Sequence, residues 1–191
     1  MFNECFSVSD IKPLENWNVS NGKNFSDMFN RCSSLSDIKP LKNWIVSFGN
    51  NFSGMFNKCS LLSDINPLKN WNVSNGKNFS SMFNRCSLLS NIKPLENWNV
   101  SYGKNFSDML EECSFSDLKP LKNWNLSNKN FFATMFTQKN CSISPKDFSP
   151  INYNENNMNA YTNFMNKNND DKNKKTLPSN RETINHYCIS F

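Results

Sequence analysis

The sequence predicts an α/β repeat fold, in which one short strand and one short helix form each 27-residue coil and successive coils stack into a solenoid. The first observation is a strict interval, because Cys5, Cys32, Cys59, Cys86 and Cys113 follow one another 27 residues apart. Methionine and tryptophan recur at the same interval, so that about five copies of one unit fill residues 1–136. One unit has apolar side chains on two faces and cannot enclose them, whereas stacked units bury them against their neighbours.

One half of each unit predicts the helix. Phe25, Met28, Phe29 and Cys32 are spaced as the apolar face of a short α-helix, and Asn24 is suited to the N-cap position. A glycine precedes this segment in four copies. We expect it to occupy a turn with positive φ, where glycine alone is free of strain. These glycines are Gly22, Gly49, Gly76 and Gly103.

The other half of the unit predicts an extended segment that ends in a short strand. A proline such as Pro40 recurs in every copy, and it excludes a helix interior and disfavours helical geometry at the residue before it. Trp44 and Val46, one residue apart, then turn the same face inward. Stacking places Trp71 between Trp44 and Trp98, so we expect Trp71 to be buried.

The chain divides into a repeat region, residues 1–144, and an Asn- and Lys-rich low-complexity tail, residues 145–191. We expect the tail to be disordered, because it has too little apolar surface to offset the entropy lost on ordering. The first residue lies inside a copy of the unit, without the polar cap that terminal repeats normally need. This is the pattern expected of a fragment of a longer array.

Residues that could perform chemistry are sparse, and we expect no catalytic residue, no cofactor and no metal ion. The single histidine, His186, is in the tail, which excludes histidine catalysis in the repeats. No CxxC motif is present, and zinc sites need ligands clustered in that way. The cysteine column is interpreted as a reduced, packed ladder, with disulfides between adjacent copies as the alternative.

Two further columns also have a structural interpretation. The tryptophans could stack on sugars or bases, but their regular spacing beside apolar residues favours core packing. An aspartate column has a lysine two residues later in most copies, which is typical of interspersed charges on a solvated edge rather than of a calcium site. These aspartates are Asp10, Asp37, Asp64 and Asp117.

The net charge excludes a nucleic-acid partner, and the hydropathy pattern excludes a membrane-spanning segment. The net charge is +5, far below the charge density of a dedicated nucleic-acid binder, so no nucleic acid is expected. No apolar run approaches the length of a membrane span, and the first residues lack the basic and apolar regions of a secretory signal. The compartment therefore cannot be assigned from these features.

The segment from Ser20 to Leu35, with Trp17 before it, resembles the BspA-type leucine-rich repeat of surface proteins, including the mycoplasma-lipoprotein-like repeat of about 25–27 residues. The shared motif is Met-Phe-x-x-Cys-Ser-x-Leu with a tryptophan in register. The sequence departs from the family where Ile-Lys-Pro-Leu replaces its Leu-Asp-Leu strand. The resemblance implies a leucine-rich-repeat-like solenoid, a cell-surface or secreted location and adhesion to a partner, with no catalytic residues to transfer.

The predicted function is a non-enzymatic, protein-binding or adhesion-type surface module, whose partner is an unknown protein or cell-surface ligand. The alternative is an intracellular repeat scaffold with no surface role, which the missing signal and the cysteine usage favour. Partner-facing columns are free to vary between copies, whereas core columns are not. The candidate contact is the turn around Phe48, Asn75 and Tyr102, where two copies have an aromatic in place of asparagine; neutral drift is the alternative there.

Overall fold

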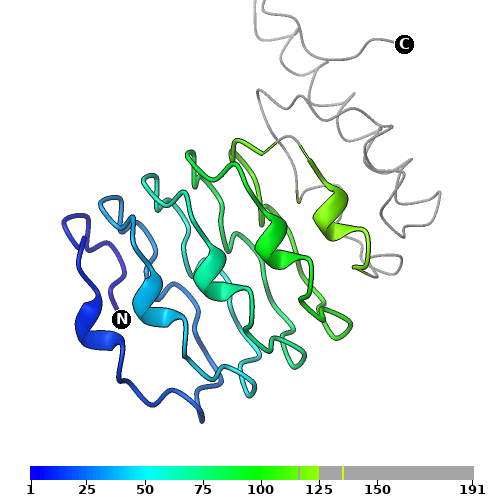
Figure 1. Cartoon of the computed structure of the whole chain (residues 1–191), viewed down its shortest axis with the longest axis horizontal. Coiled ribbons are helices and arrows are strands. Elements are labelled where there is room, and N and C mark those ends of the chain that lie inside the picture. The colour runs from blue at the N-terminus through cyan, green and yellow to red at the C-terminus, as the bar shows by residue number, and fades with distance from the viewer. Residues whose placement is uncertain (116, 125–134, 136–191) are drawn as a thin grey trace, which may run out of the picture.

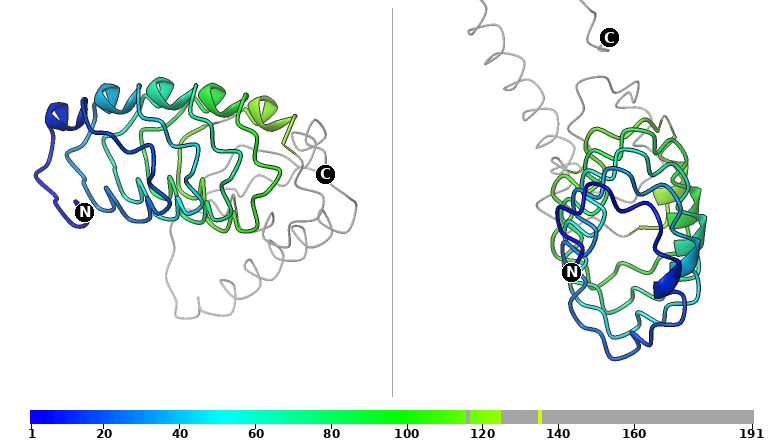
Figure 2. Two further views of the ribbon diagram at one scale, coloured as in Figure 1. Left: turned by 90° about the horizontal axis from the view of Figure 1, so that it is seen from below. Right: turned by 90° about the vertical axis from the view of Figure 1, so that its left-hand side faces the viewer.

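The computed structural model describes residues 1–115, 117–124 and 135. Each repeat unit forms one coil, and the coils lie side by side with one 3-10 helix apiece along a common face (Figure 1; Figure 2). Equivalent residues of successive units therefore form columns that run from coil to coil. The helices are η1 (Lys12–Leu14), η2 (Lys39–Leu41), η3 (Asn66–Leu68), η4 (Lys93–Leu95) and η5 (Lys119–Leu121).

The prolines that we expected to exclude a helix interior are the second residue of each 3-10 helix, within its first turn. In η2, the N–H of Leu41 donates to the carbonyl of Ile38 and the N–H of Lys42 to that of Lys39. A helix this short leaves its first N–H groups without an intrahelical acceptor, so Pro40 loses no hydrogen bond there. The Asp37 carboxylate accepts from the Lys39 N–H at 2.9 Å and so caps the turn.

A ladder of backbone hydrogen bonds joins the coils on the face opposite the 3-10 helices (Figure 2). The N–H groups of Phe25 and Phe29 donate to the carbonyls of Asn51 and Met55, at 2.8 and 2.9 Å. The same pattern repeats in the next coils. In the part of the chain that the structure describes, regular strand pairing consists of isolated parallel bridges, which join Asn24 to Asn51, Asn51 to Asn78 and Asn78 to Asn105.

The short α-helix and the short strand expected in each coil are not formed in the described residues. Asp27 and Arg31 have φ of 54° and 61°, which interrupts both a right-handed helix and an extended strand. The segment is instead a series of turns, in which Asn30 donates to Asp27 and Cys32 to Phe29. The helical spacing nevertheless identified buried side chains, because Phe25, Met28, Phe29 and Cys32 are all in the core.

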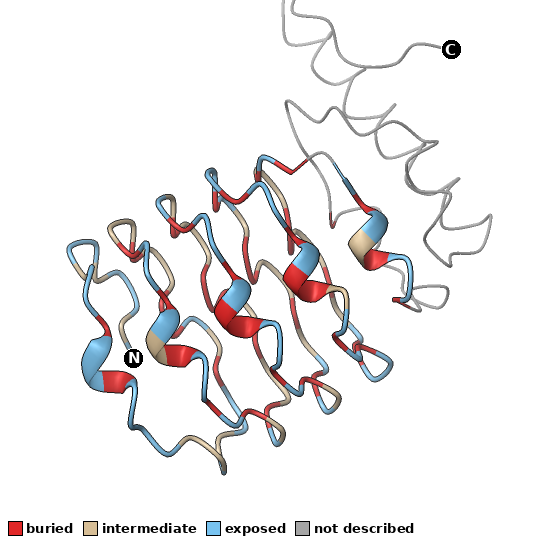
Figure 3. Ribbon diagram, in the orientation of Figure 1, coloured by how far each residue is buried: buried red, intermediate tan, exposed pale blue. Residues whose placement is uncertain are grey.

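Columns of identical side chains make up this core. Phe29 stacks on Phe56 with ring centroids 5.5 Å apart, and Trp44 stacks on Trp71 at 6.5 Å with the rings nearly parallel. Trp71 is 4% exposed, as expected for a residue in the middle of the stack. Figure 3 shows buried and exposed segments alternating along every coil, in nearly the same places from coil to coil.

The fifth coil lacks one residue, and the core register is kept. Phe115 is buried, as is Leu89 at the corresponding core place, so the missing residue is the exposed one that Leu88 occupies in the coil before. Met135 is also buried, and its carbonyl accepts a hydrogen bond from the Leu110 N–H at 3.1 Å. The predicted tail, residues 145–191, lies outside the described residues.

Candidate interaction surface

The predicted contact residues lie on a row of tight turns at one edge of the coils. In the second coil, the Gly49 N–H donates to the Val46 carbonyl at 2.8 Å, which closes a turn with Phe48 near its tip. Tyr102 has the same place in the fourth coil. Their side chains are 59% and 66% exposed, so both aromatic rings project into solvent. The structure therefore places two large aromatic groups in solvent on this edge.

The glycine that ends each turn is explained by close packing rather than by its backbone angle. Among the described glycines only Gly54 has positive φ, so the expectation for Gly49 and its equivalents is wrong. A Cβ on Gly49 would meet the ring of Phe52 and would lie 2.9 Å from the Val46 carbonyl oxygen. The phenylalanine column packs directly under the turn, and only glycine leaves room for it.

Asn75, the third predicted contact residue, is tied to the neighbouring coil. Its side-chain N–H donates to the carbonyl of Ser47 at 2.7 Å. Phe48 and Tyr102 cannot form this bond, because their side chains have no amide. The asparagine in this column therefore joins one turn to the turn before it, whereas the two aromatics are available to a partner.

The recurrent Asn-x-Ser motif has a structural explanation on the same edge. The Asn72 side-chain oxygen accepts from the Ser74 N–H at 3.1 Å, and Asn99 bonds Ser101 in the same way. In the second coil Ile45 replaces this asparagine and is 61% exposed. Sequence reasoning did not identify Ile45 as part of the surface, although an isoleucine in an asparagine column was a visible signal.

Acidic residues are absent from this edge. We call the turn edge the residues 16–26, 43–53, 70–80 and 97–107, which are the same eleven columns of four successive coils. Their only charged side chains are Lys23, Lys77 and Lys104, all of them exposed. The ion pairs of the described residues involve other cations, namely Arg31, Lys39 and Arg85. The turn edge is therefore a positive surface.

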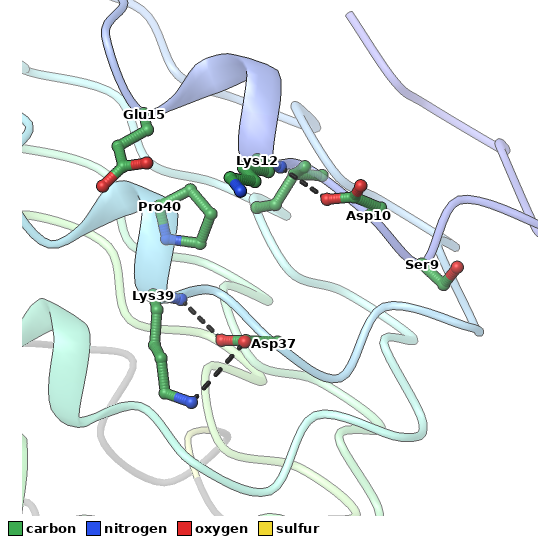
Figure 4. Close-up of a pocket in the computed structure, with 8 residues that line it drawn as sticks. Ser9, Asp10, Lys12, Glu15, Asp37, Lys39 and Pro40 are labelled. Atoms are coloured by element: carbon green, nitrogen blue, oxygen red, sulfur yellow. Dashed lines mark hydrogen bonds and ion pairs between the residues drawn. The ribbon is translucent and has the colours of Figure 1, made fainter.

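The face that carries the 3-10 helices is different, because its charges are of both signs. A shallow hollow between η1 and η2 is lined by Asp10, Lys12, Glu15, Asp37 and Lys39 (Figure 4). Each aspartate accepts from the N–H of the lysine two residues later, and the Lys39 ammonium lies 3.7 Å from the Asp37 carboxylate. The aspartates act as helix caps here.

The cysteine column lies in the core, away from both surfaces. Cys5, Cys32, Cys59, Cys86 and Cys113 are free thiols, and all but Cys5 are buried. The Cys59 thiol donates to the Phe29 carbonyl of the preceding coil, with the sulfur 3.1 Å from the oxygen. Burial raises the pKa of Cys59 to about 12, and it also raises the pKa of Cys113 to about 12. Thiols held this way are neutral and unreactive at neutral pH.

A family model described as "Mycoplasma protein of unknown function, DUF285" matches residues 1–91 and again residues 50–176. The chain belongs to the DUF285 family. The two matches overlap, as expected when a model of several repeats fits a longer array in two registers. DUF285 thus supports the repeat organisation, and its description assigns no activity. No curated protein and no solved structure gives a match to the chain.

In this DUF285 protein, then, two of the three predicted contact residues are exposed aromatics and the third joins two coils. Ile45, Lys77 and Lys104 belong to the same edge and were not predicted as contacts. In the described residues, no helix is long and apolar enough to cross a membrane. No group of three histidine, cysteine or acidic side chains suited to a metal ion occurs there either.

Proposed function

We propose that this DUF285 protein is a non-enzymatic, leucine-rich-repeat-like solenoid that binds another protein or a cell-surface ligand as an adhesion-type module. The observation that carries the proposal is the turn edge. It combines two exposed aromatic rings, Phe48 and Tyr102, with an absence of acidic residues across four coils. Exposed aromatics on a polar surface are typical binding anchors, because they bury a large apolar area at little entropic cost.

The core columns support a role in presenting this surface rather than in chemistry. Each coil buries its side chains against the next coil, so the stack forms a rigid support whose outer columns are free to differ. The Asp10 and Asp37 carboxylates beside η1 and η2 accept backbone N–H groups at the start of these helices. The resemblance to BspA-type surface repeats adds the cell-surface or secreted location to the proposal.

The second candidate function is an intracellular repeat scaffold. The observation that favours it is the column of thiols that donate to carbonyl oxygens, as Cys59 does to Phe29, because these bonds require reduced cysteines. Brief protease treatment of intact cells separates the two candidates. Cleavage of the protein without loss of a cytoplasmic marker supports the surface module, and full protection until the cells are lysed supports the scaffold.

Site-specific photo-crosslinking tests whether the turn edge is the contact. A photo-reactive phenylalanine analogue is introduced at Phe48 or at Tyr102 in the protein expressed in its own cells. The matched control is the same analogue at Lys42, which is exposed beside η2 on another face. The proposal predicts the same crosslinked product from positions 48 and 102 and none from 42. Equal products from all three positions, or none from 48 and 102, would contradict it.

A double substitution measures the contribution of the two rings once that product is identified. Phe48→Asn with Tyr102→Asn restores the residue that other coils have at this place, so the fold is preserved. We expect binding to weaken by at least about tenfold, equivalent to about 1.4 kcal/mol. Unchanged affinity in a titration of purified partner would place the contact elsewhere.

A further inference from the structure

The acidic residues of the described coils are confined to one part of the repeat. Columns before and after the turn edge contain them, and the eleven columns of the turn edge contain none. The described acidic residues are Glu4, Asp10, Glu15, Asp27, Asp37, Asp64, Glu96, Asp108, Glu111, Glu112 and Asp117. The eleven columns of the turn edge instead hold asparagine, serine, lysine and exposed apolar side chains. The absence of acidic residues from the turn edge repeats in four coils, so it is a property of the surface and not of one loop.

Backbone hydrogen bonds fix the spacing of the lysines on this edge. The Asn50 N–H donates to the Lys23 carbonyl, the Lys77 N–H to the Asn50 carbonyl, and the Lys104 N–H to the Lys77 carbonyl, at 2.7 to 2.9 Å. These four residues are therefore successive members of one column. Lys77 and Lys104 are neighbours in adjacent coils, and Lys23 is two coils from Lys77. The two neighbouring ammonium groups repel each other, and an added anion between them would relieve that repulsion.

The exposed aromatics lie beside this lysine column. Phe48 and Tyr102 are each two residues before the column, in the second and fourth coils, within the tight turn that precedes it. Ile45 extends the apolar part of the second coil. A ligand that runs along the stack would meet an apolar group at the second coil, a cation at the third, and both an aromatic ring and a cation at the fourth.

We infer that the turn edge binds an extended acidic segment of a partner protein, one that contains aromatic or aliphatic side chains between its carboxylates. This inference rests on the proposed function and names the chemistry of its partner. Carboxylates pair with the ammonium groups of Lys77 and Lys104, and apolar side chains pack on Phe48 and Tyr102. The exposed asparagine side chains of the edge hydrogen-bond the main chain of the segment.

A polypeptide fits this edge better than a nucleic acid does. Proteins that bind nucleic acid typically contact about 6–10 phosphates with cationic side chains. The turn edge offers three lysines over four coils, and the second coil contributes no charge there. Two adjacent cations flanked by aromatic rings match a segment with a few carboxylates among apolar residues.

The test uses the full chain and a fluorescein-labelled peptide of about twelve residues that alternates Glu and Tyr. Its controls are the same peptide with Gln in place of Glu, and an oligothymidine of about the same length. We expect the Glu/Tyr peptide to bind, its affinity to fall with added salt, and the Gln/Tyr peptide to bind at least about tenfold more weakly. Equal affinity for the two peptides would overturn the inference, as would tighter binding of oligothymidine.

Two double variants locate the binding. Lys77→Gln with Lys104→Gln removes the adjacent cations of the turn edge. Lys42→Gln with Lys69→Gln removes two exposed lysines from adjacent coils on the face of the 3-10 helices, with the same change in net charge. We expect the first variant to lose at least about tenfold in affinity for the Glu/Tyr peptide and the second to change by less than about twofold. Equal losses would mean that only overall charge matters and would overturn the inference.

The proposed function and this inference can fail separately. Crosslinking from positions 48 and 102 does not depend on carboxylates. If those positions yield a partner while the Glu/Tyr peptide binds no better than the Gln/Tyr peptide, the interaction surface stands and its acidic partner does not. If no partner is crosslinked from either position, the proposed function itself is wrong.

Discussion

The indole N–H of Trp71 donates a hydrogen bond to the carbonyl oxygen of Leu41, one coil earlier in the stack, at 3.1 Å. The same carbonyl accepts the backbone N–H of Trp44 within its own coil. The indole N–H groups of Trp44, Trp98 and Trp124 donate in the same way to leucine carbonyls one coil earlier. These acceptors are Leu14, Leu68 and Leu95. The tryptophan column therefore joins the coils by hydrogen bonds as well as by stacked rings, and it satisfies a buried carbonyl in η1, η2, η3 and η4.

Replacing Trp71 separates the two contributions. Trp71→Phe keeps most of the stacked area but leaves the Leu41 carbonyl with one partner, so we expect a loss of about 1 kcal/mol in the free energy of unfolding. Trp71→Ala removes the ring as well and should cost about 3–5 kcal/mol. Urea titrations followed by circular dichroism measure both values. Trp17→Ala is the control, because Trp17 is 40% exposed and should cost far less. An unchanged midpoint for Trp71→Ala would contradict the stacked core.

The buried columns could be predicted from the sequence because each column repeats one residue type at a fixed interval. That interval places Trp71 on Trp44 and Phe56 on Phe29 whatever the local backbone does. The local backbone could not be predicted in the same way. The spacing of Phe25, Phe29 and their neighbours fits one face of a helix, and it fits equally well a row of turns that buries the same side chains.

The turn conformation depends on residues whose types do not predict it. Arg31 and Lys58 both have φ of 61°, a region that neither residue prefers, and contacts with the adjacent coils hold them there. In the interaction surface, the exposure of Phe48 and Tyr102 could be predicted, because these residues replace asparagine in a column that varies between copies. The bond from Asn75 to the Ser47 carbonyl joins residues in different coils, so no pattern within one copy could indicate it.

Alkaline pH should destabilise the protein through its buried thiols. Burial raises the pKa of Cys59 from its ordinary value of 9.0 to about 12, so between these values the unfolded chain loses a proton that the folded chain keeps. The free energy of unfolding contributed by this thiol is thus fully present below pH 9 and is lost as the pH rises toward 12, by about 1.4 kcal/mol per pH unit.

Unfolding by urea at several values between pH 9 and pH 11 measures this slope. Cys59→Ala lacks the thiol, so its free energy of unfolding is lower than the parent's below pH 9 and should fall less steeply as the pH rises. Cys113, whose pKa burial also raises to about 12, should add a second slope of the same sign. Parallel curves for the parent and for Cys59→Ala would show that this thiol is not protected by folding.

The aspartates before the 3-10 helices should stabilise the fold through their hydrogen bonds to the backbone and not through their negative charge. The Asp64 carboxylate accepts from the Asn66 N–H at 2.8 Å, and in the fourth coil Asn91 accepts from the Lys93 N–H at 2.9 Å. Asp64→Ala should therefore cost about 1 kcal/mol of unfolding free energy, whereas Asp64→Asn keeps the acceptor and should cost little. Thermal and urea unfolding of the two variants compare them directly. Equal losses would indicate that the charge of Asp64, and not its hydrogen bond, stabilises the turn.

Glycine at a position of positive φ should be tolerated or stabilising, although glycine elsewhere in the same coil should not be. Ser81 has φ of 54°, and the equivalent residue one coil earlier is Gly54, with φ of 61°. Ser81→Gly relieves the strain of a left-handed serine, about 1–2 kcal/mol, and adds entropy to the unfolded chain, so we expect a net change between zero and about 1 kcal/mol of added stability. The matched control is Ser74→Gly, because Ser74 has no positive φ and is half-buried, as Ser81 is. That substitution brings the entropy cost without the relief and should destabilise by about 0.5–1 kcal/mol. Urea unfolding of the two variants gives the difference, and a Ser81→Gly protein less stable than Ser74→Gly would mean that the left-handed turn is held without strain.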